Sequence, residues 1–260
     1  MNKRRLLPTF IIGGAPRSGT TYLCHALDKH PDVFIAKPYA SPEPKVFMGP
    51  RCEPEIYYER CAAFFGDVID ERALGEKTVY YLESEEACKI IRRILPDVRM
   101  LFIVREPVAR AYSNYLWSTK NKLETLSFEE AIEFRGERPS QLPPDKSYAR
   151  PYDYLERGDY ATFAKRYYGA FGREQVAFFL YEDIQRRPVE LFRNIQKYIG
   201  VDLISLDQSG VGYINSAFDV GPPIIQETEA KLRERMGPWV RRFADLTGLD
   251  VSPWGYPGIP

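Results

Sequence analysis

Short, almost wholly apolar runs recur along the chain, with polar residues, glycine or proline at their ends. The clearest are Phe10–Gly14, Arg99–Val104 and Val176–Tyr181, and a shorter one is Val33–Ala36. Runs of this length and composition are typical of strands buried on both faces. Because helical stretches separate them, the pattern predicts a doubly wound α/β fold, with a parallel sheet flanked by helices on both faces.

Apolar residues spaced three and four apart mark the helices. The predicted helices are Ser18–Lys29, Glu85–Leu95, Pro107–Trp117, Phe128–Phe134, Tyr160–Phe171, Pro188–Ile199 and Ile225–Leu246. Residues 135–157 are rich in proline and charge, which predicts a loop or lid. Helix and strand patterns resume after this stretch in the same style, so we expect a single domain over residues 1–260.

Composition narrows the class of protein. Of the 260 residues, 44% are hydrophobic and 28% are charged, which is typical of a folded globular chain and excludes general disorder. The 36 basic and 36 acidic residues cancel, which argues against a protein that coats a polyanion. No apolar run approaches the roughly 20 residues of a membrane helix, so we expect a cytoplasmic protein with no membrane anchor.

Residues that commonly bind metals or form disulfides are sparse. The 4 cysteines lie in the first third of the chain without a C-x-x-C pair, and the 2 histidines are His25 and His30. This spacing favours ordinary thiols and predicts no zinc site.

A glycine-containing loop stands directly between the first predicted strand and the first predicted helix. Its sequence, Gly14–Thr21, matches the phosphate-loop pattern G-x-x-x-x-G-K-[ST], except that Thr20 occupies the lysine position. A cation is present three places earlier, at Arg17, and Ser18 and Thr21 add hydroxyl groups. Backbone N–H groups in this setting bind phosphate oxygens, so we predict an anion site. Without the lysine the loop is poorly suited to a triphosphate–magnesium complex. The alternative is a plain glycine turn.

A second candidate anion site follows the predicted strand Arg99–Val104. Arg105 stands at the carboxyl end of that strand, where open α/β sheets bind ligands. Pro107 suits a first helical turn, which places Ser113 about two turns further along the same helix. Two anion sites on one sheet edge imply a ligand with phosphates at both ends. Taken alone, Arg105 also fits a surface ion pair.

Together these residues resemble the sulfotransferase family that uses 3′-phosphoadenosine 5′-phosphosulfate as its donor. The first loop is similar to that family's 5′-phosphosulfate loop, and the strand-end segment is similar to its 3′-phosphate motif. Two further segments resemble the E-P-[KH]-F-F and E-K-[ST] motifs of its heparan-sulfate-type, carbohydrate branch. In chain order the matching segments are Pro16–Leu23, Glu43–Phe47, Gly75–Thr78, Val104–Pro107 with Arg110 and Ser113, and Tyr181–Asp183 with Pro188.

The resemblance implies roles for individual residues. The 5′-phosphosulfate group is expected on the first loop, and the 3′-phosphate on Arg105 and Ser113. Glu43 is expected to be the general base, Lys77 to stabilise the transferring group or orient the acceptor, and Arg17 to neutralise charge on the leaving phosphate. The expected donor-binding residues are Arg17, Ser18, Gly19, Thr20, Thr21, Arg105, Ser113 and Tyr213. No metal is implied.

Residues 212–218, which include Tyr213, replace a loop that in the family is often rich in lysine and arginine and closes over the donor. Here that loop carries no cation. Compared with the vertebrate Golgi members of the family, we expect no membrane anchor, and the C-terminal part of the sequence has no cysteines, so the chain resembles a soluble bacterial relative.

The acceptor is expected to be a hydroxyl of a carbohydrate or a small metabolite, with no nucleic acid or membrane as partner. Tyrosines and cations that follow the proline-rich stretch suit a sugar or a mildly acidic acceptor. They are Tyr148, Tyr152, Tyr154, Tyr160, Tyr167 and Tyr168, with Lys146, Arg150, Arg157, Lys165 and Arg166. Alternatively, Tyr167, Tyr168 and Phe163 pack a helix. Zero net charge does not favour a heavily sulfated polysaccharide.

Two other functions stay open at this point. One is a phosphate-loop kinase or NTPase, against which Thr20 at the lysine position argues. The other is a non-catalytic nucleotide-binding module, for which the cation-free loop at residues 212–218 is the only support. The sequence leaves the oligomeric state open.

Overall fold

The computed structural model describes residues 6–38, 43–134, 152–206 and 221–259. The strands in these ranges are β1 (Phe10–Gly14), β2 (Val33–Ile35), β3 (Ala73–Lys77), β4 (Arg99–Val104) and β5 (Val176–Leu180). The helices are α1 (Thr20–Leu27), α2 (Pro54–Ala62), α3 (Glu85–Ile94), α4 (Pro107–Lys120), α5 (Phe128–Glu133), α6 (Tyr160–Phe171), α7 (Asp183–Arg186), α8 (Pro188–Ile199) and α9 (Gln226–Thr247). Short 3-10 helices are found at Glu156–Gly158 and Ser252–Trp254.

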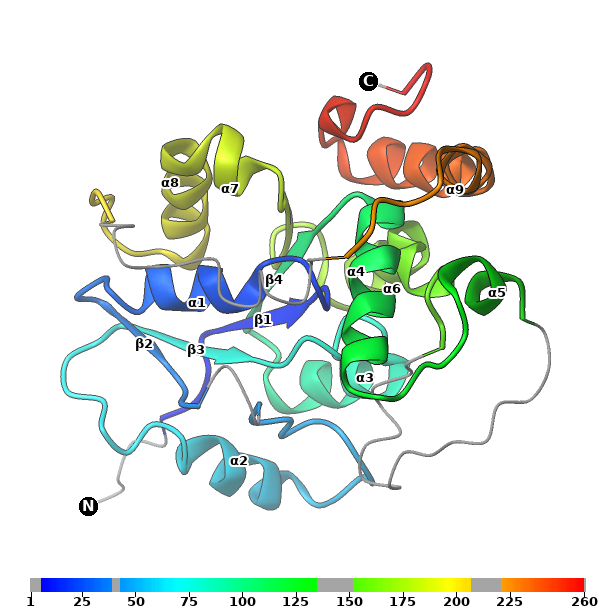
Figure 1. Cartoon of the computed structure of the whole chain (residues 1–260). Coiled ribbons are helices and arrows are strands. Elements are labelled where there is room, and N and C mark those ends of the chain that lie inside the picture. Colours follow the sequence, from blue (N-terminus) through cyan, green and yellow to red (C-terminus); the bar gives the residue numbers. More distant parts are fainter. Residues whose placement is uncertain (1–5, 39–42, 135–151, 207–220, 260) are drawn as a thin grey trace. The chain divides into compact units, whose positions relative to one another are not determined.

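The five strands form one parallel sheet in the order β2-β3-β1-β4-β5 (Figure 1). β1 therefore lies between β3 and β4, and the registers place Ile12 opposite both Lys77 of β3 and Leu101 of β4. The predicted α/β fold with a parallel sheet is confirmed. This strand order brings the carboxyl ends of β1 and β3 side by side at one edge of the sheet.

Helices cover both faces of the sheet. On one face α1 and α8 bury Leu23, Leu27 and Ile195 against strand residues that include Ile12 and Leu101. On the other face Phe102 of β4 packs edge-on against Tyr167 of α6, with ring centroids 4.6 Å apart. Figure 1 shows α1 and α8 on the side opposite α3. Burial on both faces explains why β1, β2 and β5, and β4 after Arg99, are apolar.

One strand and two α-helices of the described structure are absent from the sequence-based prediction: β3, α2 and α7. β3 reads Ala-Leu-Gly-Glu-Lys, a run with two charged residues, yet all five of its residues are buried. Its charges are compensated by contacts that no local pattern reveals. α2 is largely polar, with only Tyr57 and Cys61 buried, and so lacks a wide apolar stripe.

The chain divides into two compact units, each built from two stretches of sequence. The first unit, Met1–Val104 with Lys165–Ile214, holds the whole sheet. The second, Arg105–Ala164 with Asn215–Pro260, packs α4, α5 and α9 around a cluster that includes Val108, Phe128 and Met236. The single-domain assignment stays a prediction. Most of the expected lid, residues 135–151, lies outside the described residues.

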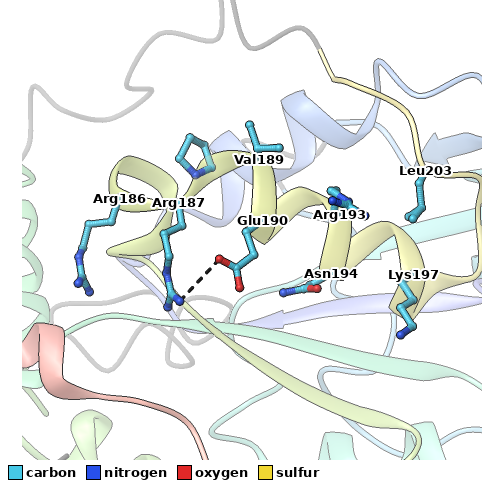
Figure 2. Close-up of a pocket in the computed structure, with 9 residues that line it drawn as sticks. Arg186, Arg187, Val189, Glu190, Arg193, Asn194, Lys197 and Leu203 are labelled. Atoms are coloured by element: carbon cyan, nitrogen blue, oxygen red, sulfur yellow. Dashed lines mark ion pairs between the residues drawn. The ribbon is translucent and has the colours of Figure 1, made fainter.

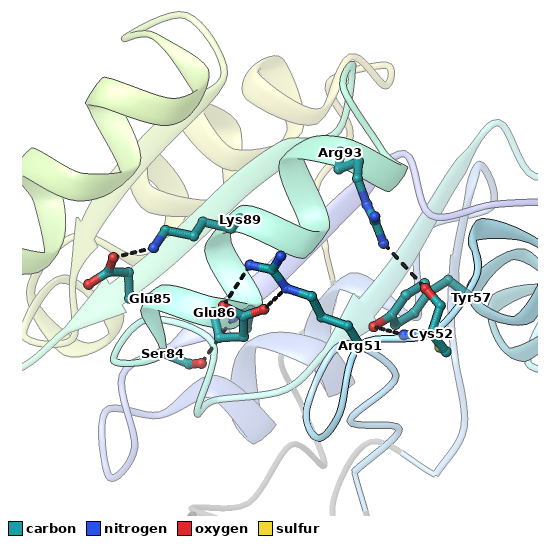
Figure 3. Close-up of polar contacts among 9 residues, drawn as sticks. Arg51, Cys52, Tyr57, Ser84, Glu85, Glu86, Lys89 and Arg93 are labelled. Atoms are coloured by element: carbon teal, nitrogen blue, oxygen red, sulfur yellow. Dashed lines mark hydrogen bonds and ion pairs between the residues drawn. The ribbon is translucent and has the colours of Figure 1, made fainter.

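A polar network ties residues 51–57 to α3 within the first unit (Figure 3). Arg51 binds the Glu86 carboxylate through two nitrogens, and Arg93 donates to the carbonyl oxygen of Cys52 at 3.3 Å. The Cys52 N–H in turn donates to the Tyr57 hydroxyl at 3.3 Å. The segment that begins at Glu43 runs on to residues 51–57, and the network fixes these residues against α3.

The four cysteines are free thiols, and burial raises the pKa of Cys24 and of Cys61 to about 12. Within the described ranges no helix has both the length and the apolar character needed to cross a membrane.

Candidate active site

The predicted phosphate loop leaves β1 and enters α1. Arg17 and Gly19 both adopt left-handed backbone conformations, with φ of 67° and 78°. A Cβ atom on Gly19 would lie 2.8 Å from Tyr181 Cδ2, so both the conformation and the space require glycine there. The Ala15 N–H donates to the Ile103 carbonyl oxygen at 2.7 Å, which anchors the start of the loop on β4.

The loop has the features of an anion site. Gly19 is the N-cap of α1 and offers no side chain to its first N–H groups, and the first turn contains no acidic residue. Uncapped N–H groups at a helix start favour an anion. Ser18 Oγ is fully buried and has no hydrogen-bond partner among the described residues. Because buried hydroxyls are normally bonded, this orphaned group is suited to an oxygen of a bound anion such as a phosphate.

A buried lysine joins this loop to Glu43. Lys77, the last residue of β3, places Nζ 2.6 Å from Glu43 Oε1, and the side chains are only 3% and 9% exposed. The same Nζ donates to Thr21 Oγ1 at 3.3 Å. The structure thus brings together three residues predicted for the site from separate parts of the chain.

The second carboxylate oxygen of Glu43 is also bonded. Glu43 Oε2 accepts a hydrogen bond from the Val79 N–H at 3.2 Å, so both oxygens have partners. A buried ion pair is tolerated when hydrogen bonds satisfy the rest of the carboxylate, as they do here. Glu43 is therefore held in one place by β3 and by the turn that follows it.

Glu76, next to Lys77 on β3, is a buried acid that sequence reasoning did not assign to the site. Its Oε1 atom accepts hydrogen bonds from the Thr78 hydroxyl at 2.6 Å and from the Tyr81 hydroxyl at 3.3 Å. Burial raises its pKa to about 8, and the nearby Glu43 carboxylate adds to the effect. The only sequence signal was its place in the E-K-[ST] segment.

The raised pKa of Glu76 predicts a pH dependence of stability. Its pKa is 4.5 ordinarily and about 8 when folded, so between these values the folded state binds more protons and stability falls as pH rises. Glu76→Gln removes this titration. The variant should therefore gain stability over the wild type by about 1.4 kcal/mol per pH unit through this window and by nothing further above it. Urea unfolding at a series of pH values measures the difference, and a constant difference would contradict it.

The residues predicted for the 3′-phosphate lie in the second unit. Arg105 precedes Glu106, the N-cap of α4, and its carbonyl oxygen accepts a hydrogen bond from the Tyr160 hydroxyl at 2.9 Å. Ser113 lies two turns into α4, as predicted from the helix start at Pro107, and its side chain is buried. Glu106 caps α4 by accepting from the N–H groups of Val108 and Ala109. Tyr213 lies outside the described residues.

The prediction that a group of tyrosines and cations faces the acceptor is wrong for several members of the group, because they are buried. Tyr154, Tyr160 and Arg157 are each 1% exposed. Arg157 donates to Asn114 Oδ1 at 3.0 Å, and Tyr154 donates to Glu124 Oε2 at 2.9 Å. These side chains pack the second unit. Tyr167 is also buried, as its alternative interpretation predicted, whereas residues 135–151, which include Tyr148, Lys146 and Arg150, are not described.

The structure also explains His30. The Asp32 N–H donates to Nδ1 at 3.0 Å, so Nε2 carries the proton and donates to the Asp202 carbonyl oxygen at 2.9 Å. Both ring nitrogens serve a buried structural contact. His30 therefore has no place in the candidate site.

A surface pocket on α7 and α8 is a separate feature (Figure 2). It is lined by Arg186, Arg187, Arg193, Lys197 and other residues up to Leu203, and Arg187 pairs with Glu190 at 3.7 Å. None of the described lining residues was predicted for the active site, so we do not assign the active site to this pocket.

The sequence model of the sulfotransferase domain matches residues 7–209, and the chain belongs to this family. A solved structure described as a sulfotransferase from Alicyclobacillus acidocaldarius is 30% identical, with a TM-score of 0.76, and the alignment covers 96% of this chain and 99% of that one. The sulfotransferase domain of the curacin biosynthetic pathway has a TM-score of 0.50 at 13% identity, which shows a shared fold.

Among curated proteins, the chain is similar to two named for heparan sulfate. It is 26% identical to mouse heparan sulfate glucosamine 3-O-sulfotransferase 3B1, over 95% of this chain and 65% of that protein. It is also 26% identical to human heparan sulfate glucosamine 3-O-sulfotransferase 6, over 97% of this chain and 75% of that protein. The chain thus spans less than two thirds of the mouse relative's length.

Proposed function

We propose that the protein is a sulfotransferase that moves the sulfuryl group of 3′-phosphoadenosine 5′-phosphosulfate to a hydroxyl of a carbohydrate. The observation that carries the proposal is the bridge made by Lys77, whose Nζ contacts both Glu43 and Thr21 of the phosphate loop. An acid, a cation and an anion-binding loop in contact are the parts that sulfuryl transfer needs. A cytoplasmic location and a single domain are part of the proposal.

The donor, when bound, supplies a sulfuryl group that is activated by its link to the 5′-phosphate. Glu43 takes the proton of the acceptor hydroxyl as its oxygen attacks sulfur, and the bond from sulfur to the phosphate oxygen breaks. Protonation of Glu43 weakens its pairing with Lys77, whose ammonium then stabilises charge on the transferring group. Arg17, Ser18 and the first N–H groups of α1 meet the charge left on the phosphate.

A carbohydrate acceptor is supported by the relatives named for heparan sulfate glucosamine. Support for Glu43 as the base comes from its burial and its fixed position. One carboxylate oxygen pairs with the Lys77 ammonium, and the other accepts a hydrogen bond from the Val79 N–H.

Adenosine 3′,5′-bisphosphate, the product of the donor, is expected to stabilise the fold more than ATP with magnesium. Thr20 stands at the lysine position on which triphosphate binding depends, whereas Arg105 and Ser113 provide for a 3′-phosphate. At about 100 times its dissociation constant, the bisphosphate should add about 2.7 kcal/mol to the free energy of unfolding. Thermal-shift titrations compare the two ligands, and equal or greater stabilisation by ATP with magnesium would contradict the proposal.

Arg105→Ala is expected to weaken binding of adenosine 3′,5′-bisphosphate by roughly 1.5–3 kcal/mol, because it removes a charge-assisted bond to the 3′-phosphate. Binding of adenosine 5′-phosphate, which lacks that group, should not change. Isothermal titration calorimetry measures both. Arg193→Ala is a matched control from the surface pocket in Figure 2 and should leave both affinities unchanged. An unchanged affinity in Arg105→Ala would place the 3′-phosphate elsewhere.

A further inference from the structure

The backbone immediately after Glu43 is held by two side-chain hydroxyls. The Lys45 N–H donates to Thr78 Oγ1 at 3.0 Å, and the Phe47 N–H donates to the Tyr81 hydroxyl at 3.2 Å. Both contacts join segments that are more than 30 residues apart in sequence. Residues 45 and 47 are thus fixed to the turn that follows β3.

The two hydroxyls share a single acceptor. Thr78 Oγ1 and the Tyr81 oxygen both donate to Oε1 of Glu76. A hydroxyl has one proton, so a bond to Glu76 leaves its lone pairs for a backbone N–H. Burial raises the pKa of Tyr81 well above its ordinary value, which keeps this hydroxyl protonated and able to donate. Two relays, each of one hydroxyl, therefore run from Glu76 to the segment that carries Glu43.

We propose that Glu76 is a positioning residue for Glu43: its Oε1 atom orients the hydroxyls of Thr78 and Tyr81, and these hold the Glu43 segment against Lys77. The inference rests on the proposed function, in which Glu43 is the general base. Lys77 contacts the Glu43 carboxylate itself, whereas Glu76 acts on the backbone that follows it.

Three observations favour this role over general packing. Glu76 is 2% exposed, and the described residues offer no partner to its Oε2 atom, so its known hydrogen bonds all belong to the two relays. Phe47 packs against Tyr81 and Tyr57, with ring centroids 5.8 Å and 5.7 Å away, which keeps the second relay buried. Lys45 has a positive φ of 52°, a conformation that needs support from its surroundings.

The relays need an oxygen acceptor at this position and no negative charge. Glutamine supplies the same carbonyl oxygen, and its amide group mimics an acid that is protonated on Oε2. Alanine supplies neither. The pair Glu76→Gln and Glu76→Ala therefore separates the relay from any role of the charge. The matched control is Glu85→Ala, which removes an exposed carboxylate that pairs with Lys89.

The test combines hydrogen exchange with kinetics on the full chain. In Glu76→Ala the amides of Lys45 and Phe47 should exchange at least tenfold faster, and kcat should fall roughly tenfold or more, since small misplacements of a reacting group are costly. The dissociation constant of adenosine 3′,5′-bisphosphate should stay within about twofold. Glu76→Gln and Glu85→Ala should keep both amide protection and kcat within about threefold of the wild type.

Thr78→Val removes one hydroxyl with little change of shape and serves if Glu76→Ala does not fold. It should release the Lys45 amide and lower kcat, while the double variant Glu76→Gln/Thr78→Val should behave as Thr78→Val alone because the two residues act as a unit. The proposal is overturned if Glu76→Gln loses as much turnover as Glu76→Ala or Thr78→Val, or if amide protection at Lys45 is unchanged in Thr78→Val. Amide exchange is measured without donor or acceptor, so failure of the relay is distinguishable from failure of the proposed function.

Discussion

Replacing Glu43 with glutamine is expected to lower kcat by about 10²-fold or more. Glutamine keeps the shape of the side chain and accepts from Lys77 or the Val79 N–H, but it cannot take a proton from the acceptor. Binding of adenosine 3′,5′-bisphosphate should change by less than about twofold, because the group that binds the donor is the loop and not Glu43. Steady-state kinetics with calorimetry on the same preparation measures both quantities.

His25→Ala is the control for this experiment. His25 lies on α1, close in sequence to the phosphate loop, and histidine is the other residue type here that could take a hydroxyl proton. His30 is unsuitable as a control because both its ring nitrogens have structural contacts. The expected result is full turnover in His25→Ala. If His25→Ala loses turnover while Glu43→Gln retains it, Glu43 is not the base.

Lys77→Met is expected to have the largest effect on stability. It leaves the Glu43 carboxylate, which is 9% exposed, without its cation, and breaking a buried pair in this way typically costs about 3–5 kcal/mol. Glu43→Gln/Lys77→Met removes both charges and should recover much of that loss. Urea unfolding of the wild type, the single variants and the double variant gives the coupling between the two residues.

The stability that the double variant regains over Lys77→Met is the quantity that tests the coupling between the two residues. If the double variant is as unstable as the sum of the two single variants, the residues do not form a coupled pair. A loss below about 1 kcal/mol in Lys77→Met would show that the pair behaves like an exposed one.

The strands that the sequence predicts are those that are apolar along nearly their whole length. β1, β2, β4 and β5 are identified within one residue of their ends, because a strand buried on both faces has few polar positions. β3 fails this criterion at Glu76 and Lys77. Their charge is accommodated by Glu43, Thr21, Thr78 and Tyr81, contacts that exist only once the chain is folded. The strand that carries Glu76 and Lys77 of the candidate site is thus the one that the local hydrophobic pattern does not predict.

The residues of the candidate site also divide into those that the sequence pattern identifies and those that it does not. The phosphate loop is evident in the sequence because its glycine and hydroxyl residues are consecutive. Glu43 and Lys77 are separated by 33 residues in sequence, and only the resemblance to sulfotransferases marked them; the structure adds that they are in contact. Glu76 has no separate signal, because its role depends on hydroxyls that the turn after β3 supplies.

The aromatic group predicted for the acceptor illustrates the opposite error. Tyrosine is amphipathic and is found both in cores and on binding surfaces, so its presence does not decide between them. Tyr154 and Tyr160 are buried in the second unit with their hydroxyls bonded to Glu124 and to the Arg105 carbonyl oxygen. Their burial results from packing against helices that are distant in sequence, which the residues next to them in the chain do not reveal.

Transfer of a radiolabelled sulfuryl group from 3′-phosphoadenosine 5′-phosphosulfate to a panel of oligosaccharides tests the proposed reaction most directly. The wild-type chain should form labelled sugar and adenosine 3′,5′-bisphosphate in equal amounts, since one bond from sulfur to acceptor oxygen forms for each bond to phosphate that breaks. Glu43→Gln should give about a hundredth of that yield or less. Equal yields from wild type and variant, or turnover of ATP with no labelled sugar from any acceptor, would contradict a sulfotransferase that uses Glu43 as its base.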